Sequence, residues 1–435
     1  MLDNVYVLSI IFFFVFSYCL FLNIKYSILM SVKWMDKRYL FFNYFMVFSF
    51  SLIFIYLSGE KNDFISYSPG SDSDLFIYFL KVINLGLSSS SYDIFSANSK
   101  NAYLEILSPI FNAIEPGSLF AICVLVFLNF NFILCISTRI LNANVYNVNA
   151  QMVSFLVLLC PLASVLMVSY LRDIFSVFLA VEICYLLHRN KERNLDFILI
   201  LVFSVMLFYT RSFYLYAIVL GYIISTIRFN YIILLSVISF FLVFLFLDLQ
   251  PLLTKLLVLH GGDNERLGNG SLSVDIDNVS NVPLLLIVER LVRGAITMLL
   301  TPQPGFIIND IIHLNSGSFK FFEDIFQLIF SYIYVALILP ITFVSIKKLN
   351  KVILLDLFSS KFHVMMFSLL LSIFIVYSIK FFGVRHYKVD FARHIFWVGF
   401  LSFFPLIQYV KTKLFAITFC LSNLLSLLIT IYVLL

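Results

Sequence analysis

The chain has 435 residues, of which 62% are hydrophobic and only 12% are charged. A soluble domain carries about 25% charged residues, so this composition excludes a water-soluble fold. The formal net charge of +5 belongs mostly to Lys and Arg residues between apolar runs, where such residues orient a membrane protein. It implies no nucleic-acid partner. We expect one integral membrane domain over residues 1–435.

Apolar runs near the ~20 residues that cross a bilayer recur along the whole chain. They predict an all-α transmembrane bundle of about twelve spans. The expected spans are 5–23, 39–58, 118–138, 151–171, 174–188, 195–210, 212–227, 231–248, 323–345, 363–382, 395–410 and 414–434. The first run lacks a basic leader and a small-residue cleavage site, so we expect it to be a retained span rather than a signal peptide.

Basic residues in the short loops predict the orientation of the bundle. They form four clusters, made of Lys25, Lys33, Lys37 and Arg38; Arg189, Lys191 and Arg193; Lys347, Lys348 and Lys351; and Lys411 and Lys413. The positive-inside rule places these clusters in the cytoplasm, where Arg139 is also expected, and puts both termini in the opposite compartment. Two long segments, 59–117 and 249–322, then lie on the outer side, and both are expected to contain short interfacial helices.

The sequence contains none of the common motifs for nucleotide, serine or zinc chemistry. It has no P-loop, no GxSxG elbow, no HExxH and no metal-spaced His/Cys cluster. We therefore expect no metal and no other cofactor. The cysteines all fall in apolar runs and are expected to be small core residues; they are Cys19, Cys123, Cys135, Cys160, Cys184 and Cys420.

Arginines on the outer side depart from the orientation rule. Arg172 and Arg211 each form nearly the whole turn between two expected spans. A charge near hydrocarbon costs about 2.5–3.5 kcal/mol at a helix centre, so its presence calls for a partner or a function, unless the side chain snorkels to the headgroups. Further arginines in outer segments are Arg290, Arg293, Arg385 and Arg393.

Arginines that face one outer cavity suit a diphosphate, because guanidinium groups bind phosphate oxygens bidentately and stay charged in any surroundings. We therefore predict that these six arginines form a diphosphate-binding set. The alternative is a salt-bridged surface, for which Asp173, Glu289 and Asp390 are available partners.

Three residues are candidates for a general base. Asp72 and Asp74 begin a helix-like segment of the first outer loop, where one of them is expected to cap the helix. The other acid could take a proton from a sugar hydroxyl, as inverting glycosyl transfer requires. His313 in the second outer segment is the rival, because its ordinary pKa lies near working pH.

Three stretches, SYLRDIFSVFL, FYTRSFYLY and RLVRGAITMLLTPQPGF, together with the many Phe-rich spans, resemble the bacterial O-antigen and oligosaccharide repeat-unit polymerases of the Wzy type. This family is related in plan to the O-antigen ligases and other GT-C-like membrane glycosyltransferases. By position, the family's diphosphate-binding arginines correspond to Arg172 and Arg211, and then to Arg290 and Arg293. The chain departs from the Arg-x10-Gly pattern of some members, because Gly221 follows Arg211 one place too early.

The resemblance implies an inner-membrane enzyme that acts on the periplasmic face. It would transfer a glycan from undecaprenyl diphosphate to the non-reducing end of another lipid-linked repeat unit, with inversion. Its partners would be these lipid-linked oligosaccharides, membrane lipid and, as an open question, a chain-length regulator protein. The lipid diphosphate is part of the substrate, so no separate cofactor is implied.

Two other functions remain open at the level of sequence. One is a membrane glycosyltransferase that uses a polyprenyl monophosphate sugar, for which fewer arginines would suffice. The other is a flippase for lipid-linked oligosaccharides. Flippases of that kind need charges within the bundle and short loops, whereas here loops of about 59 and 74 residues lie on one side, which favours an enzyme.

Overall fold

The computed structural model describes residues 2–29, 103, 106, 107, 114, 119–143, 172–189, 194–226, 304–313, single positions between 325 and 344, 360–380 and 413–434. This described part is helical and contains no strand, in agreement with the predicted all-α class. Four expected spans, 39–58, 151–171, 231–248 and 395–410, lie outside it, as does most of both outer segments.

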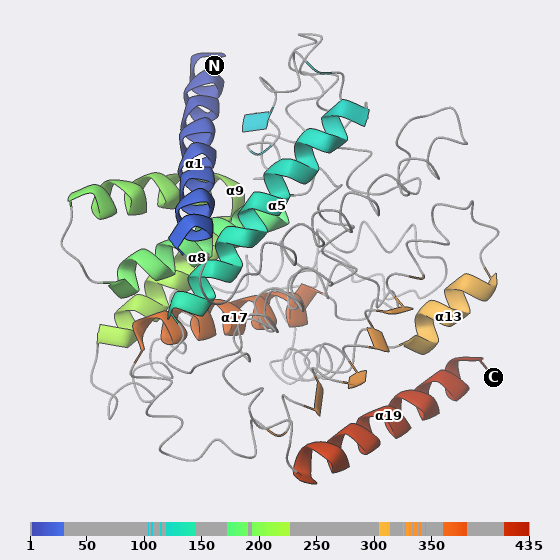
Figure 1. Cartoon of the computed structure of the whole chain (residues 1–435). Helices are drawn as coiled ribbons and strands as arrows, with labels where there is room; N and C mark the ends of the chain where they lie inside the picture. The colour runs from blue at the N-terminus through green and yellow to red at the C-terminus, as the bar shows by residue number, and fades with distance from the viewer. Residues whose placement is uncertain are drawn as a thin grey trace, which may run out of the picture.

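The described helices coincide with predicted elements (Figure 1). They are α1 (Leu2–Leu29), α5 (Leu119–Ala143), α8 (Asp173–Arg189), α9 (Asn194–Thr226), α13 (Pro304–His313), α17 (Lys361–Lys380) and α19 (Lys413–Leu434). Helices α1, α5, α8, α17 and α19 each cover one expected span, and α9 covers two. Helix α13 belongs to the second outer segment, and it packs against α19.

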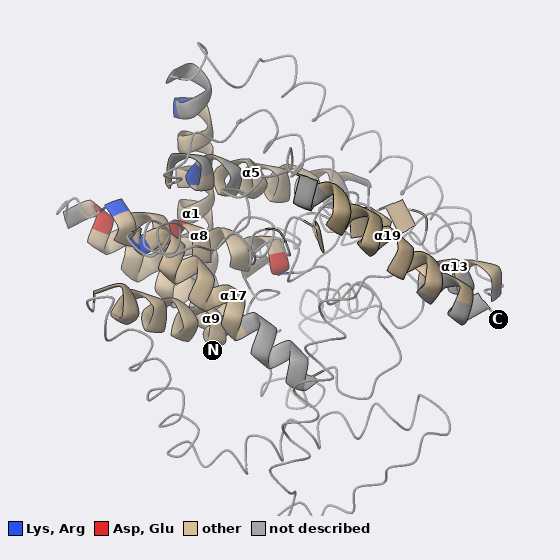
Figure 2. Ribbon diagram, turned by 90° about the horizontal axis from the view of Figure 1, so that it is seen from below, with Lys and Arg blue, Asp and Glu red and all other residues tan. Residues whose placement is uncertain are grey.

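Two of the described helices are long and apolar enough to cross a membrane, Cys123–Ile140 and Leu195–Thr226. Shorter apolar helices cover Ser9–Lys25, Lys361–Ser372 and Ala416–Leu428. Figure 2 shows that the described helices carry very few charged residues. The number of twelve spans and the sidedness of the bundle stay predictions.

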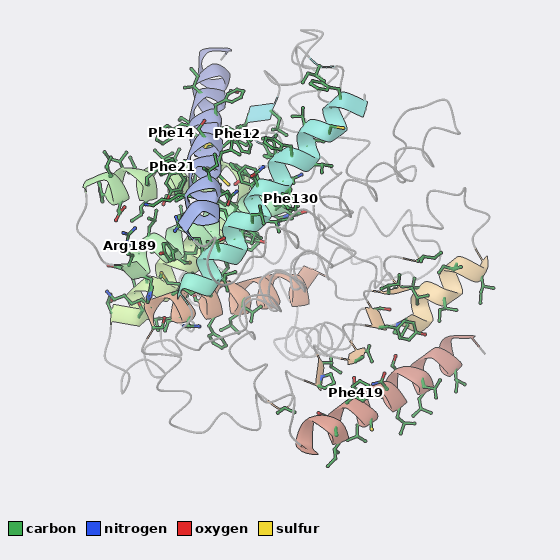
Figure 3. All side chains as sticks on the ribbon, in the orientation of Figure 1. Phe12, Phe14, Phe21, Phe130, Arg189 and Phe419 are labelled. Carbon is green, nitrogen blue, oxygen red and sulfur yellow. The ribbon has the colours of Figure 1, made fainter. Side chains whose placement is uncertain are left out.

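Phenylalanines form the centre of the packing between α1, α5 and α8. The Phe12 ring lies 5.2 Å from that of Phe175, and the Phe132 ring lies 4.8 Å from that of Phe178, measured between centroids. On the same helix α1, Phe14 and Phe21 are exposed (Figure 3). One face of α1 thus packs in the core, and the other carries apolar side chains of the kind that face lipid.

Helix α9 is broken at the position where the sequence predicts a turn. Its 33 residues would extend about 50 Å if straight, longer than the ~30 Å hydrocarbon core. Arg211 has non-helical backbone angles, φ −152° and ψ 78°, and separates two helical arms. The predicted break at Arg211 is therefore confirmed.

The C-terminal arm of α9 crosses α17 at very short range. Ser368 Oγ donates a hydrogen bond of 2.8 Å to the backbone carbonyl of Ala217. A Cβ atom added at Gly221 would lie 2.7 Å from Met365 Cα and 2.9 Å from Ser368 Cβ. The absence of a side chain at Gly221 is what lets the two helix backbones approach.

Replacing Gly221 with alanine is expected to destabilise the protein by about 1–3 kcal/mol, the usual range for overpacking a close contact. The new methyl group meets backbone atoms of α17, which cannot swing aside as a flexible side chain would. The measurement is the thermal unfolding midpoint of the purified protein in detergent. Leu220→Ala, on an exposed position of the same helix, is the matched control and should leave the midpoint nearly unchanged; equal midpoints for both variants would contradict the close crossing.

Candidate functional site

Arg172, the first of the two arginines in predicted turns between spans, lies at the N-terminus of α8. The backbone carbonyl of Arg172 accepts hydrogen bonds of 2.9 Å from both the backbone N–H and the Oγ hydroxyl of Ser176. Arg172 therefore occupies the position just before the helix, and Asp173 lies in its first turn. The N-terminal end of a helix is positive and favours negatively charged groups, so this end suits both the Asp173 carboxylate and an external anion.

Arg211, the second of these two arginines, lies at the break in α9 and reaches the same place. Arg211 Nη2 donates to Asp173 Oδ1 in a close ion pair. Both side chains are nearly buried, with exposed fractions of 9% for Arg211 and 5% for Asp173. The guanidinium carbon of Arg211 also lies 5.5 Å from the centre of the buried Tyr214 ring, so the cation is held on two sides.

Arg172 makes the complementary contact with the other arm. Its Nη1 atom donates a 2.7 Å hydrogen bond to the backbone carbonyl of Thr210, the residue directly before the break. The Arg172 side chain is half-buried, so part of it reaches the surface. The structure thus places Arg172 and Arg211 side by side, each bonded to the segment that carries the other. It also shows an ion pair between Arg211 and Asp173, which was the alternative partner that the sequence offered.

A tyrosine of the first outer segment also reaches this place. Tyr103 is buried and its ring stacks on Phe175 at 5.7 Å between centroids. Burial raises the pKa of the Tyr103 phenol, and the nearby Asp173 carboxylate raises it further, so the phenol stays neutral and able to donate. Close by in sequence, the carbonyl of Ile106 accepts a 3.0 Å hydrogen bond from Ser9 Oγ of α1. Sequence reasoning missed Tyr103, although it lies in a predicted interfacial helix.

The other predicted site residues are not brought to this place by the described structure. Asp72, Asp74, Arg290, Arg293, Arg385 and Arg393 lie outside the described residues. His313 is the last residue of α13. Figures 1 and 2 both show α13 beside α19, well separated from α8 and α9. Only the two turn arginines are therefore seen to meet.

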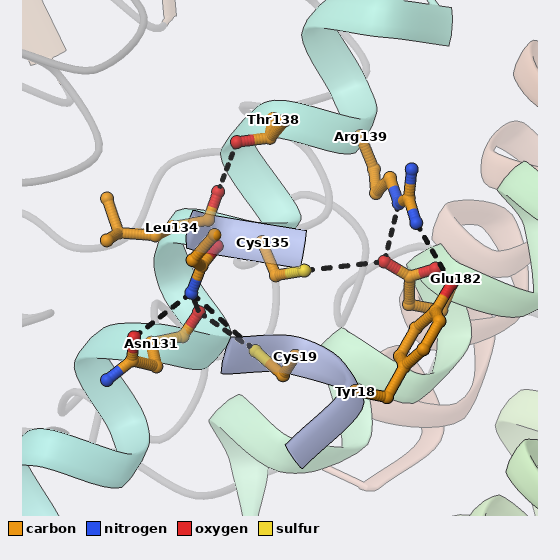
Figure 4. A network of polar contacts seen from close by, with 9 residues as sticks. Tyr18, Cys19, Asn131, Leu134, Cys135, Thr138, Arg139 and Glu182 are labelled. Carbon is orange, nitrogen blue, oxygen red and sulfur yellow. Dashed lines mark hydrogen bonds and ion pairs between the residues drawn. The ribbon is translucent and has the colours of Figure 1, made fainter. Parts of the chain in front are cut away.

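A second polar cluster lies inside the packing of α1, α5 and α8 (Figure 4). Arg139 Nε donates to Glu182 Oε1 at 2.7 Å, and Arg139 Nη2 donates to the Tyr18 hydroxyl at 3.0 Å. Cys135 Sγ lies 3.5 Å from the same carboxylate oxygen, and the Arg139 guanidinium lies 4.2 Å from the Tyr185 ring centre. We call these five residues the Arg139 network.

The Arg139 network was not predicted from the sequence, and the position of Arg139 in it corrects one expectation. Arg139 was expected among cytoplasmic loop residues, but it lies inside α5 and is buried, and Glu182 has no exposed surface. The buried ion pair joins α5 to α8, and the Tyr18 hydroxyl adds α1. Such a cluster is suited to fixing the relative positions of three helices rather than to binding a ligand.

The cysteines follow the prediction in part. Cys19, Cys135 and Cys184 are buried as expected, and Cys123 is partly buried. Cys420 is exposed on α19, so the expectation of a core position was wrong there. Among the described residues no group of three His, Cys, Asp or Glu side chains could hold a metal ion. Cys160 lies outside these residues.

Comparison with known proteins adds no name to this site. No protein-family model, no curated protein and no solved structure matches the chain.

Proposed function

We propose that the chain is a membrane glycosyltransferase that polymerises lipid-linked glycans, transferring a glycan from a polyprenyl diphosphate to another lipid-linked repeat unit. The observation that carries this proposal is the meeting of Arg172 and Arg211 at the N-terminus of α8. Three positive groups are gathered there, two guanidinium groups and the end of a helix, within a chain of strongly apolar composition. Such a place suits the diphosphate of a lipid whose tail lies in the bilayer.

The chemistry requires little besides this charge. When the glycosidic bond breaks, negative charge develops on the leaving diphosphate, and fixed arginines stabilise that charge. In inverting transfer, the attacking hydroxyl approaches from the face opposite the leaving group, so its base must lie away from the arginines. Asp72, Asp74 and His313 stay the candidates for this base.

The test is genetic replacement in the host, read as the lipopolysaccharide pattern on a gel. Deletion of the gene should remove the ladder of long chains and leave one repeat unit on the core. The wild-type gene should restore the ladder. Complete loss of repeats in the deletion strain would instead indicate a flippase and overturn the proposal.

Arg172→Glu should fail to restore the ladder, because it reverses one of the charges that would hold the diphosphate. Arg189→Glu is the matched control, since Arg189 is an exposed arginine at the other end of the same helix, and it should complement fully. An affinity tag on each protein measures its amount in the membrane. A normal ladder with Arg172→Glu at normal abundance would remove the diphosphate-binding role of this site.

A further inference from the structure

The Asp173–Arg211 ion pair opposes the binding of any anion to Arg211. The pair is nearly buried, and separating a buried pair is costly because each charge loses a partner in surroundings of low polarity. A phosphate that binds Arg211 must therefore displace the Asp173 carboxylate. Arg172 is less buried than Arg211, and its Nη1 atom bonds the neutral carbonyl of Thr210.

From this competition we infer that Asp173 is a positioning residue that limits how tightly the lipid diphosphate is held, and so allows the carrier to leave after transfer. This inference rests on the proposed function. After the glycan has been transferred, the carrier diphosphate remains bound to the arginines, and its departure frees the site for the next substrate. When Asp173 pairs with Arg211 again, it takes the place of one phosphate contact and favours that departure.

Tyr103 provides a second reason to place this exchange here. While Arg211 binds phosphate, the nearly buried Asp173 carboxylate loses its contact with that cation. The Tyr103 ring stacks on Phe175, two residues after Asp173, at 5.7 Å between centroids, and the Asp173 charge raises the pKa of its phenol. Asp173 also lies in the first turn of α8, the end of a helix that favours a carboxylate. Tyr103 therefore supports the state in which Arg211 has left Asp173.

The inference predicts that removing the Asp173 charge increases the affinity for a lipid diphosphate. Asp173→Asn should tighten the binding of a lipid diphosphate, because Arg211 no longer has to give up a carboxylate, whereas a variant that merely damages the site would weaken binding. The measurement uses the purified full chain in detergent with farnesyl diphosphate as the probe. We expect the dissociation constant to fall by roughly tenfold, a change of the size that one weak polar contact gives, with slower dissociation of the probe.

Two further variants complete the experiment. Asp196→Asn removes a carboxylate from the first turn of α9, away from the break, and should leave the dissociation constant unchanged. Tyr103→Phe keeps the ion pair but removes the phenol, and should weaken the binding of farnesyl diphosphate several-fold. The Tyr103 variant also tests the inference if Asp173→Asn does not elute as a folded protein in size-exclusion chromatography.

The outcomes separate the inference from the proposed function. If wild-type protein binds neither farnesyl diphosphate nor inorganic diphosphate, the proposed function fails. If wild-type protein binds the probe but Asp173→Asn binds it equally or more weakly, the role of Asp173 is overturned while the proposed function stands. Inorganic diphosphate serves as the arm without a lipid tail, and the same rise in affinity on Asp173→Asn would locate the competition at the phosphates.

Discussion

Replacing Arg139 with methionine is expected to lower the free energy of unfolding by about 3–5 kcal/mol, the range for removing one partner of a buried ion pair. The loss is large because Glu182 has no exposed surface and its Oε2 atom accepts no hydrogen bond within the described part of the chain. Without Arg139, the Glu182 carboxylate would keep only the weak thiol contact of Cys135. The measurement is the unfolding midpoint and the denaturant dependence of the protein in detergent.

The double variant Arg139→Met/Glu182→Gln is the informative companion. It removes both charges, so no buried ion is left unpaired, and replacing both partners of such a pair is often close to neutral. Most of the lost stability should therefore return. Lys25→Met, at an exposed position of α1, is the control for removing a cation, and its midpoint should match that of wild type. A double variant as unstable as Arg139→Met would mean that Arg139 stabilises the core through its other contacts.

The helices themselves could be predicted from the sequence because their signal is local. An apolar run of about twenty residues specifies a helix in lipid without reference to the rest of the chain. The break in α9 was also local, since Arg211 and Asp196 are the only charged residues of this 33-residue helix and Arg211 lies between its two apolar arms. The charge that marked the turn is the residue at which the backbone leaves the helical conformation.

The contacts between helices could not be predicted in the same way. Arg139 and Glu182 are 43 positions apart and lie in different apolar runs, and nothing local shows that the two runs pack together. Gly221 is a similar case. Its position suggested a departure from a family pattern, whereas the structure shows it as the contact point of α9 with α17.

The candidate site was predictable only as far as its arginines. Arg172 and Arg211 were identified because each is a charge in a turn between apolar runs, and Asp173 was identified as an available partner. The exchange of contacts, with Arg172 bonded to Thr210 and Asp173 to Arg211, depends on how two turns meet in space. Tyr103 belongs to a segment of mixed composition, where its burial had no signal in the sequence.

The two polar clusters are connected through one helix. Asp173 and Glu182 both belong to α8 and are separated by about 14 Å along its axis, at 1.5 Å per residue. The Arg139 network fixes α8 against α1 and α5 at one level, and the Phe175 and Phe178 rings fill the space toward the site. These core contacts hold α8, the helix that carries Asp173, while the carboxylate itself pairs with Arg211.

Under the proposed function, Arg211→Met should abolish polymerisation and also destabilise the protein by about 3–5 kcal/mol, because it removes the Arg211 cation from the nearly buried Asp173 carboxylate. That single variant cannot separate a binding role from a structural role. The double variant Arg211→Met/Asp173→Asn removes both charges and should regain most of the stability, as judged by the unfolding midpoint. It should still give no ladder on a lipopolysaccharide gel, since the charge that would hold the second phosphate is gone.

The double variant therefore decides what Arg211 is for. If it is stable and inactive, and Asp173→Asn alone still gives a ladder, Arg211 acts on the substrate, and the ion pair with Asp173 is the resting arrangement of a binding group. If it is stable and restores the ladder, the pair only joins α8 to the break in α9, and the site must lie elsewhere in the outer segments. Because the double variant differs from Arg211→Met at one position only, abundance in the membrane can be compared directly between them.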